Sequence, residues 1–217
     1  MAKNALVEHR PWLLASIAAA IAFYFLRDNP IGGVWLILLK GAGVSLLLAY
    51  ALRRASGANA WLLAGYLALC AAGDMAIELD EFAGGALFLT GHLVAIALYL
   101  RNRRHQTVAT QRVLAVCLVI AAPGISYLLS GSLPVAIYAV GLGLMAGLAW
   151  MSRFSRYRVG IGAVLFVISD WLIFSQMGNT NLGAIPHLAI WPLYYLGQFL
   201  IATGVVQTLR GDLPSAK

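Results

Sequence analysis

The stretch that decides the fold is Gly162-Ala-Val-Leu-Phe-Val-Ile-Ser-Asp-Trp171, in which one aspartate, Asp170, interrupts an otherwise apolar segment. A second stretch, Cys70-Ala-Ala-Gly-Asp-Met-Ala-Ile-Glu78, has the same character around Asp74. A carboxylate in the core of a bilayer costs on the order of 2.5–3.5 kcal/mol on insertion scales. Because of this cost, an aspartate within an apolar segment of each half of the chain indicates that these two residues have a functional role.

Composition identifies the class of protein. The chain has 217 residues, of which 61% are hydrophobic and 11% are charged. Soluble domains carry about 25% charged residues, so we predict a single polytopic membrane domain over residues 1–217. The net charge of +7 comes from basic residues in short loops between apolar segments. Such residues set membrane topology, and we expect no nucleic-acid partner.

Eight apolar segments predict an all-α integral membrane fold, a bundle of eight transmembrane helices. The segments cover residues 11–26, 31–52, 60–79, 82–100, 111–129, 133–150, 158–177 and 186–208. Turn residues separate them, and abundant Gly and Ala let the helices approach closely. Asp74 falls in the third helix and Asp170 in the seventh, which predicts a parallel repeat of two four-helix halves.

Basic residues predict the orientation of this bundle. If there are eight helices, the loop Lys and Arg residues precede the first helix or follow the second, fourth, sixth and eighth. Arg27 is the one basic loop residue on the opposite side, and Lys40 lies inside the second helix. Basic loops face the cytoplasm. We therefore expect both termini to be cytoplasmic, in the plasma membrane (the inner membrane of a bacterium).

Five helices carry polar side chains toward one layer, counted from the outer helix ends. At 1.5 Å per residue, Asp74 lies roughly 8 Å deep and Asp170 roughly 10 Å deep. Lys40, His92 and Tyr195 lie roughly 14–15 Å deep. If these side chains face inward, they line one cavity that opens to the outer leaflet or the outer solvent. Spacing fixes the depth of a residue but not the rotation of its helix.

Each polar residue also has a structural interpretation. Asp74 and Asp170 could pair with Lys40 and hold the bundle together, and Lys40 could neutralise an aspartate or contact a phosphate. Four other side chains could bind substrate or form hydrogen bonds between helices: His92, Tyr194, Tyr195 and Gln198. Glu78 shares a helix face with Asp74 and is predicted to be a solvated boundary residue. Ser169 has no neighbouring His, so a serine nucleophile is weakly supported.

The chemistry that remains is that of a carboxyl pair. The sequence has no Gly-x-Ser-x-Gly elbow and no Walker loop. His92 is the one deep histidine, so no three-histidine zinc site is predicted. In a low-dielectric pocket one carboxyl group can stay protonated while the other stays ionised. Such a pair suits a reaction through an oxocarbenium ion. It would equally serve as the proton relay of a proton-coupled transporter or lipid flippase.

The order and spacing of four motifs resemble the YhhN family of membrane lysoplasmalogenases, which is related to an animal transmembrane family of the same activity. The motifs are Gly73-Asp74, Gly91-His92, Phe166-Val-Ile-Ser-Asp170 and Tyr194-Tyr-Leu-Gly-Gln198-Phe-Leu-Ile201. Lys40 matches a lysine in the second helix of the family, although Gly41 follows it where proline is expected. Trp171 follows Asp170 where small residues are common. The resemblance runs from the second helix to the eighth.

The resemblance implies hydrolysis of the vinyl ether bond of a lysoplasmalogen, which gives a fatty aldehyde and glycerophosphoethanolamine or glycerophosphocholine. It implies that one of Asp74 and Asp170 is the acid and that the other stabilises the cation or activates water; their order stays open. Lys40, with His92 or Tyr195, would hold the phosphate or set the protonation of the aspartates. The expected partners are a lysophospholipid substrate and membrane lipid, with no metal or organic cofactor.

Overall fold

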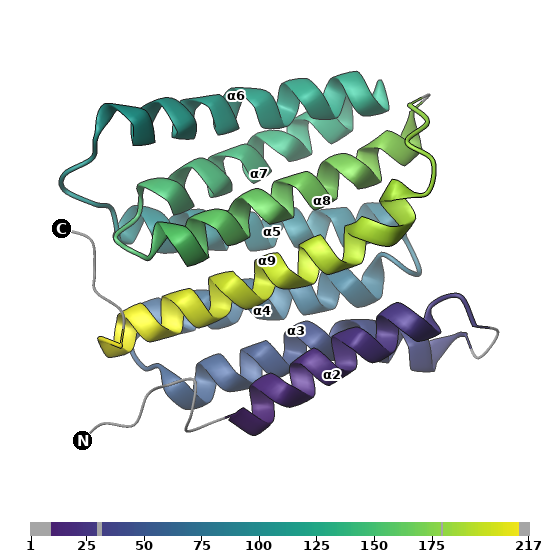
Figure 1. Ribbon diagram of the computed structural model, residues 1–217, viewed down its shortest axis with the longest axis horizontal. Coiled ribbons are helices and arrows are strands. Elements are labelled where there is room, and N and C mark those ends of the chain that lie inside the picture. Colours follow the sequence, from purple (N-terminus) through teal and green to yellow (C-terminus); the bar gives the residue numbers. More distant parts are fainter. Residues whose placement is uncertain (1–9, 30–31, 179, 213–217) are drawn as a thin grey trace. The chain divides into compact units, whose positions relative to one another are not determined.

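The computed structural model describes residues 10–29, 32–178 and 180–212. These residues form eight α-helices joined by short connections, as Figure 1 shows. The helices are α2 (Arg10–Leu26), α3 (Val34–Arg54), α4 (Ala58–Ala76), α5 (Glu81–Arg101), α6 (Ala109–Ser130), α7 (Leu133–Met151), α8 (Ile161–Met177) and α9 (Ile185–Arg210). A π-helical turn, η1 (Arg156–Gly160), leads into α8.

The all-helical fold is confirmed, and each predicted range coincides with one of these helices to within one turn. The predicted start of the second helix, Ile31, lies outside the described residues. Six described helical segments are long and apolar enough to cross a membrane: α3, α5, α6, α7, α8 together with η1, and α9. This is therefore a multi-pass membrane protein. The shorter α2 is also apolar, whereas α4, which contains Asn59 and Asp74, is not among the six. Eight spans and cytoplasmic termini stay predictions.

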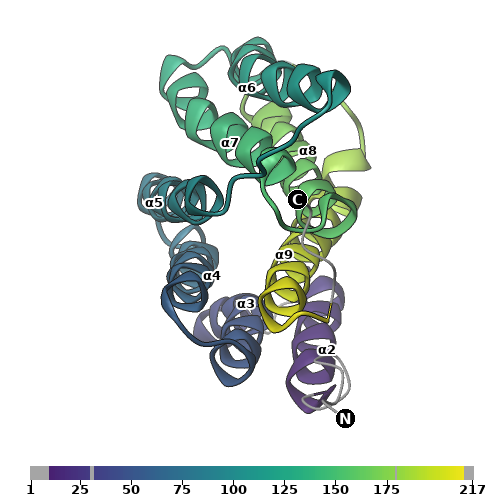
Figure 2. The same cartoon turned by 90° about the vertical axis from the view of Figure 1, so that its left-hand side faces the viewer.

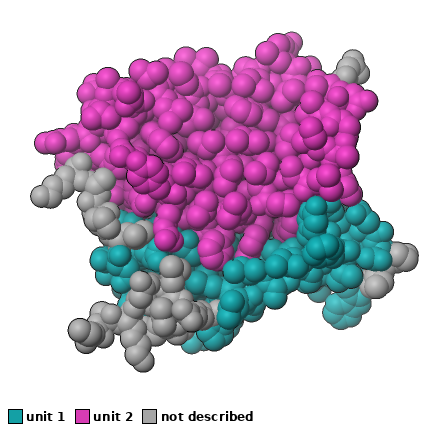
Figure 3. All heavy atoms as spheres, in the orientation of Figure 1, with its two compact units in different colours: residues 1–95, 202–214 teal, residues 96–201, 215–217 magenta. Residues whose placement is uncertain are grey.

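The chain divides into two compact units, drawn in teal and magenta in Figure 3. Unit 2 comprises Ile96–Ile201, and unit 1 comprises the described residues on either side of it. The first boundary, after Ala95, falls near the end of the fourth helix, where the sequence predicts the junction between two four-helix halves. The single membrane domain and the parallel repeat themselves stay predictions.

Glycines allow close helix packing in unit 1. There α3 lies between α2 and α4, as Figures 1 and 2 both show. A Cβ atom added to Gly41 of α3 would lie 2.6 Å from Cγ of Met75 on α4. On the other side of α3, the Ser16 hydroxyl of α2 donates a hydrogen bond to the Gly43 carbonyl at 2.6 Å. A side chain larger than glycine at position 41 would therefore displace Met75 or separate the two helices.

Unit 2 is built from α6, α7 and α8, which contact one another, and from the part of α9 that packs on α8. Gly162 of α8 and Gly197 of α9 face each other, because a Cβ atom added to either would lie 2.7 Å from the carbonyl oxygen of the other. A Cβ atom on Gly143 of α7 would lie 2.9 Å from the Leu118 carbonyl oxygen on α6. Glycine is therefore required at both helix contacts.

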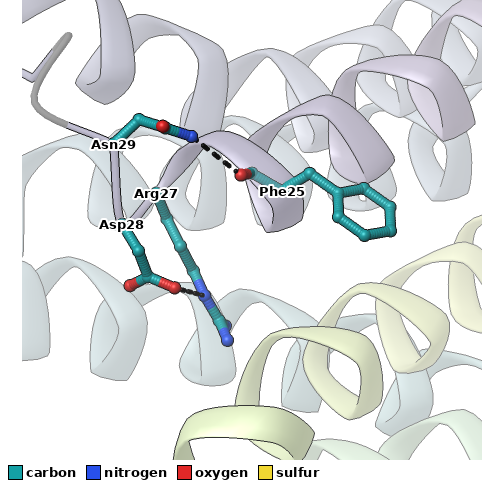
Figure 4. Close-up of polar contacts among 4 residues, drawn as sticks. All are labelled: Phe25, Arg27, Asp28 and Asn29. Atoms are coloured by element: carbon teal, nitrogen blue, oxygen red, sulfur yellow. Dashed lines mark hydrogen bonds and ion pairs between the residues drawn. The ribbon is translucent and has the colours of Figure 1, made fainter.

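Local contacts fix the end of α2, as Figure 4 shows. The side-chain amide of Asn29 donates to the Phe25 carbonyl at 3.1 Å and so satisfies an acceptor that the helix end leaves unpaired. Arg27 Nε lies 3.7 Å from the Asp28 carboxylate, and its guanidinium lies 4.4 Å from the centre of the Tyr24 ring. Arg27 is the one basic loop residue on the predicted outer side. Because its charge is balanced by Asp28, it counts less against the predicted placement of basic loops on the cytoplasmic side.

Replacing Gly162 with alanine tests the contact between α8 and α9. We expect Gly162→Ala to lower the free energy of unfolding in detergent by about 1–3 kcal/mol, because its methyl group meets the Gly197 carbonyl. Gly124→Ala in α6 is the control, since no atom lies within 4 Å of a Cβ at Gly124. That variant should be neutral or more stable by up to about 1 kcal/mol. Unfolding of both variants is followed by circular dichroism. Equal free energies of unfolding for the two variants would contradict the close contact between α8 and α9.

Candidate active site

The residues that the sequence predicts to be functional fall into two groups, one in each unit. Unit 1 contains Lys40, Asp74, Glu78 and His92. Unit 2 contains Ser169, Asp170, Tyr194, Tyr195 and Gln198. Asp74 and Asp170 belong to different units, and the prediction that their carboxyl groups share one chamber stays a prediction.

Lys40 and Glu78 form an ion pair in unit 1. The Lys40 ammonium donates to Glu78 Oε1 at 2.5 Å and also lies 5.7 Å from the centre of the Phe23 ring, within the range of cation–π attraction. The Lys40 side chain is 16% exposed and that of Glu78, in the turn after α4, is 37% exposed. The sequence predicts solvent around Glu78 and an aspartate or a phosphate for Lys40. In the structure these two residues pair with each other.

Asp74 on α4 and His92 on α5 are both buried. The contact at Gly91 sets their relative level, because a Cβ atom added there would lie 3.4 Å from Sγ of Cys70 on α4. His92 therefore lies near the level of Cys70, which is one helical turn, or about 6 Å, from the level of Asp74. The offset agrees with the depths counted from the sequence, in which His92 is the deeper residue.

A hydrogen bond from Tyr138 on α7 holds Asp170 on α8. The Tyr138 hydroxyl donates to Asp170 Oδ2 at 2.8 Å, and Asp170 is only 5% exposed. Among the described residues, Tyr138 is the one hydrogen-bond donor to this carboxyl group. The Tyr138 ring meets Phe174 edge-on with 5.8 Å between centroids, which restrains the hydroxyl. The arrangement orients one carboxyl oxygen and leaves the other to exchange a proton or contact a ligand.

Tyr138 is not among the residues predicted from the sequence. It lies five residues into the predicted span 133–150, about 8 Å from the helix end that is predicted to be outer. That depth is close to the roughly 10 Å counted for Asp170. The depth of Tyr138 along its predicted helix therefore places it in the same layer as Asp170, and this is the signal in the sequence that could identify it.

The two neighbours of Asp170 tie α8 to other helices of unit 2. The Ser169 hydroxyl donates to the Ile190 carbonyl on α9 at 2.9 Å, and the Trp171 indole donates to the Ala122 carbonyl on α6 at 3.4 Å. Because Ser169 gives its hydroxyl proton to a backbone carbonyl, it has no activating base, which argues against a nucleophile. Trp171 links α8 to α6.

Tyr194 and Tyr195 belong to an aromatic cluster on α8 and α9. Tyr194 meets Phe166 edge-on with 5.2 Å between centroids, and Tyr195 stacks on Trp191 at 6.3 Å. Ser169 lies opposite Ile190 in the same antiparallel pair of helices. The two tyrosines therefore lie about one turn farther than Asp170 from the end of the unit where α8 ends and α9 begins.

Gln198 is fully buried, and neither atom of its side-chain amide has a hydrogen-bond partner among the described residues. It follows Gly197, which faces Gly162, so it lies about two turns, or roughly 12 Å, from the level of Asp170. Unit 2 thus brings Tyr138 to Asp170 and leaves Gln198 apart.

The described residues contain no group of three His, Cys, Asp or Glu side chains that could hold a metal ion.

Comparison with known families identifies the chain. The model of the YhhN family matches residues 35–205. The chain belongs to the YhhN family. The match to the YhhN model runs from the start of α3 into α9 and so includes every candidate residue of both units. No curated protein and no solved structure matches the chain.

A double-mutant cycle tests the ion pair of unit 1. Lys40→Met and Glu78→Gln should show a coupling free energy of about 0.5–1 kcal/mol in chemical unfolding, the upper range for a pair that is partly open to solvent. The control cycle combines Lys40→Met with Glu81→Gln, since Glu81 is exposed at the start of α5 and Glu78 is the carboxylate that pairs with Lys40 among the described residues. We expect that cycle to be additive. Additivity in both cycles would contradict the ion pair.

Proposed function

We propose that this YhhN-family protein is a lysoplasmalogenase-like ether hydrolase. Its substrate would be a lysoplasmalogen, and its products a fatty aldehyde and glycerophosphoethanolamine or glycerophosphocholine. The observation that carries the proposal is the buried Asp170 carboxyl, hydrogen-bonded by Tyr138 inside apolar helices. Family membership supports it. We place the protein in the plasma membrane with both termini in the cytoplasm, because the basic loops follow the positive-inside rule.

The proposed reaction starts with a proton transfer to carbon. A carboxylic acid protonates the vinyl ether carbon that is farther from the oxygen, and the electron pair of the double bond forms the new C–H bond. The resulting oxocarbenium ion takes up water at the carbon bonded to oxygen, and that water loses a proton to a carboxylate. The hemiacetal then breaks its C–O bond and releases the aldehyde and the alcohol. The sum consumes one water and requires no redox partner.

We assign the two proton-handling roles to Asp74 and Asp170, one as the acid and the other as the group that stabilises the cation or accepts the water proton. Tyr138 is a positioning residue, because it acts by orienting the Asp170 carboxyl. Lys40 is already neutralised by Glu78, which favours a supporting role over direct phosphate binding. The candidates for substrate contacts are His92, Tyr194, Tyr195 and Gln198.

Replacement of each aspartate by asparagine tests the acid–base roles. Asp74→Asn and Asp170→Asn should each slow aldehyde release from a vinyl-ether lysolipid by about 10²- to 10⁴-fold, because an amide does not exchange the required proton. Asp80→Asn is the matched control. Asp80 is exposed and accepts a hydrogen bond from the Ala83 N–H at 2.8 Å at the start of α5, and asparagine caps a helix equally well.

The assay is done in detergent, where no ion gradient exists, and thermal unfolding is measured for each variant. Full activity in a folded Asp74→Asn or Asp170→Asn variant would remove that residue from the mechanism. Absence of aldehyde release from the folded wild-type protein would instead favour a transporter. Loss of folding in both variants would support the structural interpretation of these acids.

Tyr138→Phe tests the positioning role. Loss of a hydrogen bond to a carboxylate costs about 1.5–3 kcal/mol, so we expect kcat for aldehyde release to fall by about ten- to a hundredfold with little change in KM. Tyr127→Phe is the control, because Tyr127 lies on α6 and is half exposed. A Tyr138→Phe enzyme that keeps the wild-type kcat and the wild-type pH profile would show that the hydroxyl only stabilises the fold.

A further inference from the structure

A pocket of about 920 Å³ lies in unit 2 at the connection between α5 and α6. Its polar lining includes Arg103, Arg104, His105, Thr107, Gln111 and Arg112. The pocket is remote from Asp170, since Trp171 contacts Ala122, eleven residues along α6 from Gln111, or on the order of 16 Å. It is therefore separate from the carboxyl site of this unit.

The connection that forms the pocket is anchored to the end of α7. Buried Asn102 accepts two hydrogen bonds from Arg153 at 2.8 Å, one at its carbonyl from the backbone N–H and one at its side-chain oxygen from Nε. Its own amide donates to the Leu98 carbonyl at 2.8 Å. The Arg104 N–H donates to the Met151 carbonyl at 3.1 Å. The backbone therefore holds the neighbouring arginines in place before any ligand arrives.

Within the described part of the chain, no carboxylate forms an ion pair with the arginines of this pocket. Asp170 is the only Asp or Glu between residues 96 and 201, and it lies at another level of the unit. By contrast, Arg27, Lys40 and Arg210 each lie within 4 Å of a carboxylate. The contacts of Arg104 show most clearly that these arginines lack a carboxylate to bind. Its Nε is buried without a hydrogen-bond partner among the described residues, and its Nη1 reaches only Gln111 Oε1 at 3.3 Å.

Repulsion between neighbouring positive charges further destabilises the charged Arg104 side chain. Burial and the nearby positive charge of Arg156 both lower the pKa of the Arg104 guanidinium. A bound anion would relieve both effects, because it would supply acceptors to the buried Nε and neutralise the facing charges. Arginine is suited to phosphate, whose oxygens match the planar fork of N–H donors.

We propose that this pocket binds a phosphate group. The pocket lies where α5 ends and α6 begins, at the ends of two apolar helices long enough to span a membrane. Phospholipid headgroups occupy that level of a bilayer, and clustered basic residues there attract anionic lipids. The phosphate would come from an anionic phospholipid of the adjacent leaflet or from a soluble phosphate ester, and the experiment separates these sources.

The test uses the full-length protein in a neutral detergent. Binding of short-chain phosphatidylglycerol, short-chain phosphatidylcholine and inorganic phosphate is measured separately by isothermal titration. We expect Arg104→Gln combined with Arg112→Gln to weaken phosphatidylglycerol binding at least tenfold. Arg101→Gln is the matched control, since Arg101 is exposed at the end of α5 and is not among the residues that line the pocket. Its affinity should stay within twofold of the wild type.

Two outcomes support the proposal and identify the source. Tight binding of phosphatidylglycerol with no binding of phosphate assigns the pocket to a lipid headgroup, whereas comparable binding of phosphate assigns it to a soluble phosphate ester. The proposal is overturned if neither anion binds, if phosphatidylcholine binds as well as phosphatidylglycerol, or if Arg101→Gln weakens binding as much as the double variant. If that double variant does not fold, Arg103→Gln with Arg112→Gln, both at exposed residues, takes its place with the same expectation.

Discussion

Hydrocarbon offers a carboxyl group no hydrogen-bond partner, so an acid inside an apolar helix must find its partner in the protein. For Asp170 that partner is the Tyr138 hydroxyl on α7. Ser169 and Trp171, the residues on either side, bond to α9 and α6. Consecutive residues of a helix point about 100° apart, so these three residues link α8 to three different helices. One short polar stretch thereby organises unit 2.

Glycines lie directly beside several other polar residues of the helices. Gly41 follows Lys40, Gly73 precedes Asp74, Gly91 precedes His92 and Gly197 precedes Gln198. A Cβ atom added to Gly41, Gly73 or Gly197 would lie 2.6–3.1 Å from an atom of a neighbouring helix, which leaves little or no room for a larger side chain, whereas Gly91 is in ordinary contact with Cys70 at 3.4 Å. The adjacent polar side chain is then turned to a different face of the same helix. Adjacent residues of the sequence thus determine both where two helices pack closely and where a polar side chain lies.

The helices could be predicted from the sequence because apolar runs and turn residues act locally. The ends at Leu26, Ser130 and Met177, for example, follow from Asp28-Asn29, Gly131 and Gly178. The offset between Asp74 and His92 along their helices could also be predicted, since it depends only on counting residues. Partners could not, because they depend on the rotation of each helix. The Lys40–Glu78 ion pair and the Tyr138 hydrogen bond therefore appear only in three dimensions.

In the proposed reaction the protein delivers a proton to a carbon atom of its substrate. The most direct measurement is the deuterium content of the aldehyde formed in heavy water, trapped at once as an oxime so that enolisation adds no label. The account predicts one deuterium on the carbon next to the carbonyl group. Release of unlabelled aldehyde, or of a fatty acid in place of an aldehyde, would contradict it.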